Sequence, residues 1–269
     1  MDTIGFVGSG NMAEALINGI IAAKIYAPEN VFVSDIRTER LEFLAGKYGV
    51  TVVENNADLA GKVETLVLSV KPQNMTDALV SIKEAISGET LVISIAAGIK
   101  VAKIAAVLGD MAIVRVMPNT PALIGEGASA LYANERAKSL LEQALSIFSS
   151  VGKAVVVDNE DLIDAVTAVS GSGPAYYFLL MEEMIKAGVE LGLPEDVAKD
   201  LVLQTAKGAG LLAVEADKNG ESPAELRRKV TSPGGTTEAA LKKLAANDYS
   251  RLITDALTAA CDRSKELSG

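Results

Sequence analysis

The feature that most constrains the fold is a change of pattern near residue 160. Before that point, short β-branched runs alternate with segments of helical spacing, whereas only helical patterns follow it. Alternating strands and helices are typical of a doubly wound, mostly parallel sheet. The sequence therefore predicts an α/β protein, with a Rossmann-type dinucleotide-binding domain over residues 1–160 and an all-helical domain over residues 161–269.

Short β-branched runs predict eight strands in the first domain. Most of the first six are separated by helical patterns, and the last two flank a helix over residues 136–149 and extend the sheet at one edge. The expected strands cover residues 4–7, 31–34, 50–53, 65–69, 91–95, 113–116, 128–132 and 154–157. In the second domain, helices are expected over residues 174–191, 194–216, 223–229, 236–246 and 249–267.

The charge and the residue types of the chain exclude several functions. The formal net charge is −10, and basic residues cluster too little to neutralise a phosphate backbone, so no nucleic-acid partner is expected. The chain has no histidine, which removes imidazole bases, Ser-His-Asp triads and histidine-ligated metals. No carboxylate cluster has metal-ligand spacing, so no metal site is expected. What remains is chemistry that an organic cofactor carries.

The single cysteine and the apolar runs indicate a cytoplasmic protein. Cys261 is the only cysteine, which excludes an internal disulfide and fits a reducing cytosol. Asp2 precedes the first strand, and no basic start leads into an apolar stretch, so no secretory signal is expected. The apolar run over residues 175–181 stops at Glu182 and is too short to span a bilayer, so no membrane association is expected.

A glycine-rich turn joins the first strand to the first helix. Gly8 permits the tight turn, Gly10 lets a pyrophosphate approach the backbone, and Ala13 allows close packing of helix and strand. Such a turn alone is a weak signal, but here the strand and helix are present and a second strand ends before Asp35. The sequence therefore predicts a dinucleotide site. The residues expected at the pyrophosphate are Gly8, Ser9, Gly10, Asn11 and Met12.

The residues expected at the adenosine ribose give a mixed signal. Asp35 can accept hydrogen bonds from both ribose hydroxyls, which favours NAD, and its charge repels a 2′-phosphate. Ser34, Arg37 and Arg40 favour NADP, because a hydroxyl and guanidinium groups can hold that phosphate. These residues leave the choice between NADPH and NADH open.

Two further strand ends are expected at the same edge of the sheet, where ligands of open α/β sheets lie. Val70, Lys71 and Pro72 follow the fourth strand, and the segment 117–121, which contains Asn119, follows the sixth. Lys71 and Asn119 can present polar groups to a nicotinamide ribose or amide. Taken singly, each segment is more typical of an ordinary turn fixed by proline.

A second group of anion-binding residues lies late in the chain, over residues 231–237. Two adjacent glycines leave backbone N–H groups accessible, hydroxyls flank them, and the helix that follows presents its positive end. This pattern suits a cradle for a carboxylate or phosphate, although taken by itself it is more typical of a capped helix start without a ligand. The residues of this cradle are Ser232, Gly234, Gly235, Thr236 and Thr237.

The C-terminal helices carry alanine and glycine on more than one face, as in residues 207–213. About a hundred residues of such helix would leave a wide apolar surface if they stood alone. Burial against a second copy of the chain is expected, although these faces could instead cover the first domain.

Taken together in chain order, these motifs resemble the pyrroline-5-carboxylate reductase family. The resemblance runs nearly from end to end, and the late Ser-Pro-Gly-Gly-Thr block is its most specific part. The matching segments are Gly8-x-Gly10-x-x-Ala13, Val70-Lys71-Pro72, Ala96-Ala97-Gly98, Met117-Pro118-Asn119-Thr120-Pro121, Ser170-Gly171-Ser172-Gly173-Pro174-Ala175-Tyr176 and residues 231–237.

The resemblance implies an enzyme of proline biosynthesis that reduces a cyclic imine, 1-pyrroline-5-carboxylate, to L-proline with NADPH, or with NADH in some members. It also implies a homodimer formed by intertwined C-terminal helices, and in many members a decamer built from such dimers. By matching positions, Ser34 and Asn56 are expected near the adenosine ribose and its phosphate. Asp35 departs from many members that prefer NADPH. The residues expected along the nicotinamide half are Val70, Lys71, Ala97 and Asn119.

The same resemblance implies that Glu160 and Lys229 touch substrate or cofactor in some members. A protonated ring imine already accepts a hydride readily, so a chain without histidine can catalyse this step by orientation. The amides of residues 234–237 and the Ser232 hydroxyl suit the ring carboxylate. Thr237 can hydrogen-bond the ring nitrogen and is the expected catalytic residue.

Two other functions fit parts of the pattern. A β-hydroxyacid dehydrogenase would place a catalytic lysine on the first long C-terminal helix, but Lys186 lies too far along that helix. A regulatory module that senses nucleotide would need a partner surface and no second ligand cradle.

Overall fold

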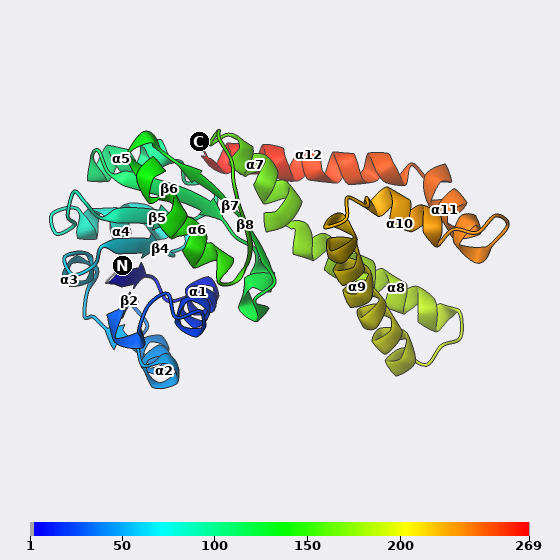
Figure 1. Ribbon diagram of the computed structural model, residues 1–269, viewed down its shortest axis with the longest axis horizontal. Coiled ribbons are helices and arrows are strands. Elements are labelled where there is room, and N and C mark those ends of the chain that lie inside the picture. Colours follow the sequence, from blue (N-terminus) through cyan, green and yellow to red (C-terminus); the bar gives the residue numbers. More distant parts are fainter. Residues whose placement is uncertain (1–2, 269) are drawn as a thin grey trace. The chain divides into compact units, whose positions relative to one another are not determined.

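The computed structural model describes residues 3–268, and its contacts divide the chain into two compact units (Figure 1). The first unit comprises the chain up to Pro174 together with the segment from Thr258 onward, and the second unit is Ala175–Leu257. The end of the last helix therefore returns to the first unit. The domain boundary expected at residue 160 stays a prediction.

The first unit contains one eight-stranded sheet in the order β3-β2-β1-β4-β5-β6-β7-β8. All neighbours are parallel except β6 and β7, which pair antiparallel. The predicted α/β fold is therefore confirmed, including the extension at one edge. The strands are β1 (Ile4–Val7), β2 (Val31–Ser34), β3 (Thr51–Val52), β4 (Thr65–Leu68), β5 (Leu91–Ser94), β6 (Ala112–Met117), β7 (Gly127–Ala133) and β8 (Gly152–Val156).

Helices connect these strands. The α-helices are α1 (Asn11–Ala22), α2 (Thr38–Tyr48), α3 (Asn56–Ala60), α4 (Met75–Ile82), α5 (Val101–Leu108), α6 (Leu141–Ser149) and α7 (Leu162–Val166). Short 3-10 helices are η1 (Pro28–Asn30), η2 (Pro72–Asn74), η3 (Thr120–Ile124) and η4 (Glu135–Leu140), and η5 (Thr167–Gly171) is a π-helix. The sequence did not predict α7 and η5. A five-residue helix shows no periodicity, and Thr, Val, Ser and Gly in η5 are weak helix formers.

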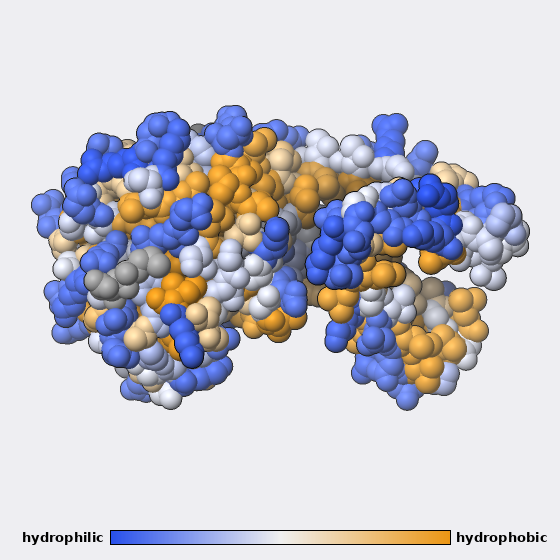
Figure 2. Space-filling model, viewed as in Figure 1, coloured by the Kyte–Doolittle hydropathy of each residue, from blue (hydrophilic) through white to orange (hydrophobic). Residues whose placement is uncertain are grey.

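The second unit is formed by helices, as expected. They are α8 (Gly173–Glu190), α9 (Glu195–Asp217), α10 (Pro223–Lys229), α11 (Thr236–Ala246) and α12 (Tyr249–Ser268), of which α8 begins and α12 ends in the first unit. Among residues 175–257, Ala198 and Ala216 are the only buried apolar side chains. Large apolar side chains are exposed instead, and hydrophobic residues lie on the surface near α8 and α9 (Figure 2).

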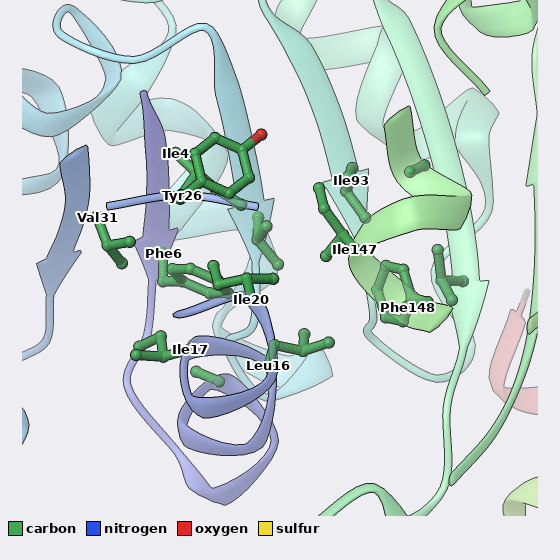
Figure 3. Close-up of a cluster of buried hydrophobic side chains, with 14 of the residues drawn as sticks. Ile4, Phe6, Leu16, Ile17, Ile20, Tyr26, Val31, Ile93, Ile147 and Phe148 are labelled. Atoms are coloured by element: carbon green, nitrogen blue, oxygen red, sulfur yellow. The ribbon is translucent and has the colours of Figure 1, made fainter. Parts of the chain in front are cut away.

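The first unit, by contrast, has an apolar layer on each face of its sheet. Strand residues alternate between the layers, because Phe6 belongs to one cluster and the adjacent Val7 to the other. The layer that contains Phe6 is completed by α1, α2 and α6, and Figure 3 shows Leu16, Ile20 and Phe148 in it. The opposite layer is completed by α3, α4 and α5. Both faces of the sheet are therefore covered, which leaves the loops at the strand ends as the places for polar residues.

Where residues 3–268 are described, none of the helices is long and apolar enough for a membrane span. The same residues contain no group of three or more histidine, cysteine, aspartate or glutamate side chains placed to hold a metal ion.

Substitution of Gly152 tests the close pairing of β7 and β8. Its φ is +144°, and a Cβ built there would lie 2.1 Å from the carbonyl oxygen of Gly127. Backbone cannot yield as a side chain can, so we expect Gly152→Ala to lower the free energy of unfolding by about 2–4 kcal/mol. Denaturant unfolding followed by circular dichroism measures the change.

The matched control is Gly46→Ala in α2, where a built Cβ meets nothing within 4 Å. This change should stabilise the protein by about 0.5–1 kcal/mol, since alanine is the better helix former. Equal behaviour of the two variants would contradict the packing described for Gly152.

Candidate functional site

The parallel register brings several predicted cofactor residues to one edge of the sheet. Val7 pairs with both Ser34 and Leu68, Leu68 pairs with Ser94, and Ser94 pairs with Arg115. The loops that follow β1, β2, β4, β5 and β6 therefore start side by side at the carboxyl ends of the strands. The residues predicted for the cofactor lie in these loops or in the elements next to them: Ser34 ends β2, Asn11 and Met12 begin α1, and Asn56 begins α3.

The glycine turn after β1 leaves open space in front of helix α1. Gly8 has φ +89°, donates its N–H to the Ser34 carbonyl at 2.9 Å, and would carry a Cβ 3.0 Å from the Ser69 backbone. Gly10 is the N-cap of α1, makes no side-chain cap, and a Cβ built there meets nothing within 4 Å. The amides of Asn11 and Met12 lie in the first turn, where helix N–H groups lack intrahelical partners.

Asp35 supports the glycine turn. Its carboxylate accepts a hydrogen bond from the Ser9 amide at 2.7 Å, and two from the Arg37 guanidinium at 3.0 Å. The Asp35 side chain is only 7% exposed. Burial raises the pKa of Asp35, but the hydrogen bonds from Arg37 and Ser9 outweigh it and hold that pKa below its usual value. The oxygens expected to contact ribose are thus engaged within the protein.

Arg40 also holds the glycine turn. Its Nε donates to the Ser9 carbonyl at 2.6 Å, its Nη2 hydrogen-bonds Glu14 of α1, and its guanidinium lies 5.1 Å from the Phe43 ring centre. Arg37 has a half-exposed side chain. Both arginines line an open pocket beside the end of β2. The Arg37 side chain is 59% exposed and the Arg40 side chain 18%, so Arg37 is the more accessible of the two.

Ser34 and Asn56 are joined by a hydrogen bond. The Ser34 hydroxyl donates to Asn56 Oδ1 at 2.8 Å, and Asn56 Nδ2 donates to Ser81 Oγ at 3.0 Å. Asn56 begins α3, and Ser34 ends β2, so the bond fixes these two elements at the edge of the sheet. The two polar side chains expected near the adenosine phosphate therefore lie together.

The loops expected at the nicotinamide differ in how much of them is exposed. Lys71 and Pro72 are exposed at the start of η2, and Val70 and Ala97 are half-buried. Asn119 is buried, and its side chain is engaged at both ends: Oδ1 accepts from the Ala128 amide at 2.8 Å, and Nδ2 donates to the Ser170 carbonyl at 3.1 Å.

The two charged residues that the resemblance implied have partners inside the protein. Glu160 accepts from the Val101 amide at 2.7 Å and from Arg115 Nη1 at 3.0 Å. Lys229 forms an ion pair with Glu221. Whether either side chain also touches a ligand stays a prediction.

The late block lies in the second unit and forms a compact turn before α11. Gly235 is the N-cap of α11 without a side-chain cap, and its own N–H donates to the Ser232 carbonyl at 3.0 Å. Thr236 and Thr237 occupy the first turn, where helix N–H groups lack intrahelical partners. Gly234 has φ +72° and donates its N–H to the carboxylate of Glu238 at 2.8 Å. The turn already presents an amide to a carboxylate of its own chain.

Three charged residues with clear roles, Glu238, Arg115 and Asp164, were missed from the sequence. Glu238 follows the late block as an acidic residue in a first helical turn, which is a common helix-start signal. Arg115 interrupts an otherwise apolar strand and is 1% exposed. A buried arginine normally has a charged partner, so its position in this strand was a signal of an ion pair. Its partners Glu160 and Asp164 lie more than forty residues later, and no local pattern connects them.

Two domain families match this chain. Residues 160–267 match the family described as pyrroline-5-carboxylate reductase dimerisation, and residues 3–98 match NADP oxidoreductase, coenzyme F420-dependent.

Several proteins are similar over nearly the whole chain. A pyrroline-5-carboxylate reductase of Pseudomonas aeruginosa is 48% identical over 98% of this chain and 96% of its own length. The solved structure of a pyrroline-5-carboxylate reductase from Coxiella burnetii is 40% identical with a TM-score of 0.94, covering 100% of this chain and 99% of that one. The Plasmodium falciparum pyrroline carboxylate reductase with NADP bound is 34% identical with a TM-score of 0.87, covering 99% and 98%. The chain belongs to the pyrroline-5-carboxylate reductase family.

Proposed function

We propose that this protein is a pyrroline-5-carboxylate reductase, an oxidoreductase of proline biosynthesis. It reduces the C=N bond of 1-pyrroline-5-carboxylate to give L-proline, with NADPH as the hydride donor and NADH as a possible alternative. The observation that carries this function is similarity to reductases of the same name over nearly the full length of the chain, at up to 48% identity. The lack of histidine agrees with it, because the reaction needs no imidazole.

The residues at the edge of the sheet fit a dinucleotide. The open space at Gly10 and the uncapped start of α1 suit a pyrophosphate, with Asn11 and Met12 as amide donors. In our proposal the remaining loops hold the two ends of the cofactor. Ser34, Asn56 and Arg37 hold the adenosine half, and Val70, Lys71, Pro72, Ala97 and Asn119 border the nicotinamide half.

The contacts of Asp35 favour NADPH over NADH. A carboxylate that reads ribose must keep oxygens available, whereas Asp35 accepts from Ser9 and from the Arg37 guanidinium. The ion pair also offsets the charge that would repel a 2′-phosphate. The Arg37 side chain is still more than half exposed, which suits binding of that phosphate. Asp35 in this proposal shapes the site and does not select NAD.

The chain's part in the chemistry is orientation. The bound nucleotide supplies a hydride to the imine carbon. The ring imine is basic enough to arrive protonated, so no strong acid is required of the protein. We assign the ring carboxylate to the Thr236 and Thr237 amides and the Ser232 hydroxyl, and the ring nitrogen to the Thr237 hydroxyl. The Gly234 amide joins them only when the substrate displaces Glu238 from it.

We also propose a homodimer that forms through the C-terminal helices, and a decamer built from these dimers as a further assembly. Two observations support the dimer: the match of residues 160–267 to a dimerisation family, and the exposed apolar side chains of α8 and α9. They include Tyr177, Phe178, Leu179, Leu180, Leu201 and Leu211. The net charge of −10 and the lone cysteine favour a cytoplasmic enzyme without nucleic-acid or membrane partners.

The function is tested by mixing purified protein with 1-pyrroline-5-carboxylate and NADPH. We expect nicotinamide absorbance to fall as L-proline accumulates, with NADH supporting a lower kcat/KM. Binding of NADPH without its oxidation would favour a nucleotide-sensing module. Oxidation of a β-hydroxyacid with NADP in place of imine reduction would favour a dehydrogenase.

Thr237→Ala tests the substrate cradle. We expect kcat to fall by about a hundredfold, as for removal of one positioned donor at a reaction centre, while NADPH affinity stays within a factor of about two. Steady-state kinetics and direct NADPH titration give the two values. Thr237→Ser keeps the hydroxyl and should retain most activity. An equal loss of turnover and nucleotide affinity would show that Thr237 is structural.

Asp35→Asn distinguishes support of the turn from recognition of ribose. Since Ser9 loses a charged acceptor, we expect the Kd values of NADPH and NADH to rise together by about tenfold. The companion Arg37→Ala should weaken NADPH alone. Nucleotide titration at fixed ionic strength measures both. Weaker NADH binding combined with tighter NADPH binding in Asp35→Asn would identify Asp35 as a ribose ligand.

A further inference from the structure

The last turn of α12 packs against the loop that follows β5. Gly98 in that loop has φ +70°, and a Cβ built there would lie 3.1 Å from both the Cβ and the carbonyl oxygen of Leu267. Both segments belong to the first unit. The backbone of the Ala96-Ala97-Gly98 loop therefore rests directly on the end of the chain.

Hydrogen bonds to a buried aspartate fix that end of the chain. Asp164 is buried, and its Oδ1 accepts from the Ser264 hydroxyl at 2.7 Å and from the Ser268 hydroxyl at 3.3 Å. Ser264 is itself buried. Because α12 is held through two hydroxyls one turn apart, its rotation about its own axis is fixed along with its position.

The same cluster holds the other end of the loop. Arg115 Nη2 lies 3.9 Å from Asp164, and Nη1 donates to Glu160 at 3.0 Å. Glu160 in turn accepts from the amide of Val101, where α5 begins directly after the loop. The loop is thus held at two points, by Leu267 at Gly98 and by Glu160 at Val101. Arg115 connects the two, because it lies between Glu160 and the Asp164 carboxylate that holds α12.

The cluster is chemically costly for a purely structural role. Two carboxylates face one guanidinium that is 1% exposed, and Nε and Nη2 of Arg115 have no hydrogen-bond partner among residues 3–268. Buried ion pairs are often no more stabilising than apolar side chains of the same size. The cluster is better explained by a positioning role, in which it holds α12 and the start of α5 in place. Preorganised binding sites rely on supporting hydrogen bonds of this kind.

We propose that Asp164 and Ser264 are positioning residues for nucleotide binding. Through Leu267, and through Arg115 and Glu160, they hold the Ala96-Ala97-Gly98 loop in its binding conformation. The inference rests on the proposed function only in that this loop borders the cofactor. Neither positioning residue touches the nucleotide, so both act through the loop.

Ser264→Ala tests this inference in the full-length protein. We expect the Kd of NADPH, measured by direct titration, to rise by about tenfold, the loss typical of one hydrogen bond to a charged group. The Michaelis constant for the imine substrate at saturating NADPH should change less than about twofold. Hydrogen exchange at amides 96–101 should accelerate in the nucleotide-free protein, because the loop loses its support.

Three variants complete the experiment. Ser264→Thr keeps the hydroxyl and should restore NADPH affinity. Arg263→Ala removes an exposed side chain on the same turn and should alter neither affinity nor exchange. Ser268→Ala removes the second hydroxyl that donates to Asp164 and serves if Ser264→Ala does not fold; it should also lower NADPH affinity.

Unchanged NADPH affinity and unchanged exchange at residues 96–101 in Ser264→Ala and Ser268→Ala would overturn the inference, even if the melting temperature fell. These readouts do not require turnover. If the protein failed to reduce 1-pyrroline-5-carboxylate while Ser264→Ala still weakened NADPH binding, the proposed function would fail and the positioning role would stand.

Discussion

The parallel register of β1, β2, β4, β5 and β6 is the constraint on which the rest of the structure depends. It forces loops from distant parts of the chain to start at one edge of the sheet. The apolar layers on both faces keep this register, because a slip by one residue would turn every buried strand side chain to the wrong face. Polar residues can then accumulate at the edge without entering a core.

Several polar side chains at that edge hold the protein's own loops. Asp35 holds the glycine turn, Asn119 joins the end of β6 to β7 and to the π-helix, and Glu160 holds the start of α5. A chain without histidine must rely on placement for catalysis, since it has few groups that can transfer a proton at neutral pH. Rigid loops are therefore as necessary to the proposed reaction as the groups that touch the ligand.

The sequence predicted the sheet well because its signal is local. Runs such as Ile4–Val7 and Val31–Ser34 are short, β-branched and bounded by turn residues, and the structure has strands at these positions. The π-helix Thr167–Gly171 was missed because its residues favour other conformations and tertiary contacts hold it. The partners of Arg115 were also missed, since its ion pairs join residues more than forty positions apart. Motif matching found candidate ligand residues but not whether their side chains were engaged.

A crystal structure with NADP and a saturated five-membered ring carboxylate as product analogue would show whether the late block holds the acid group of the substrate. We expect the ring carboxylate within hydrogen-bond distance of the Thr236 and Thr237 amides, with the ring against the nicotinamide and the Thr237 hydroxyl near the ring heteroatom. An analogue bound elsewhere, with residues 231–237 remote from the nicotinamide, would contradict it.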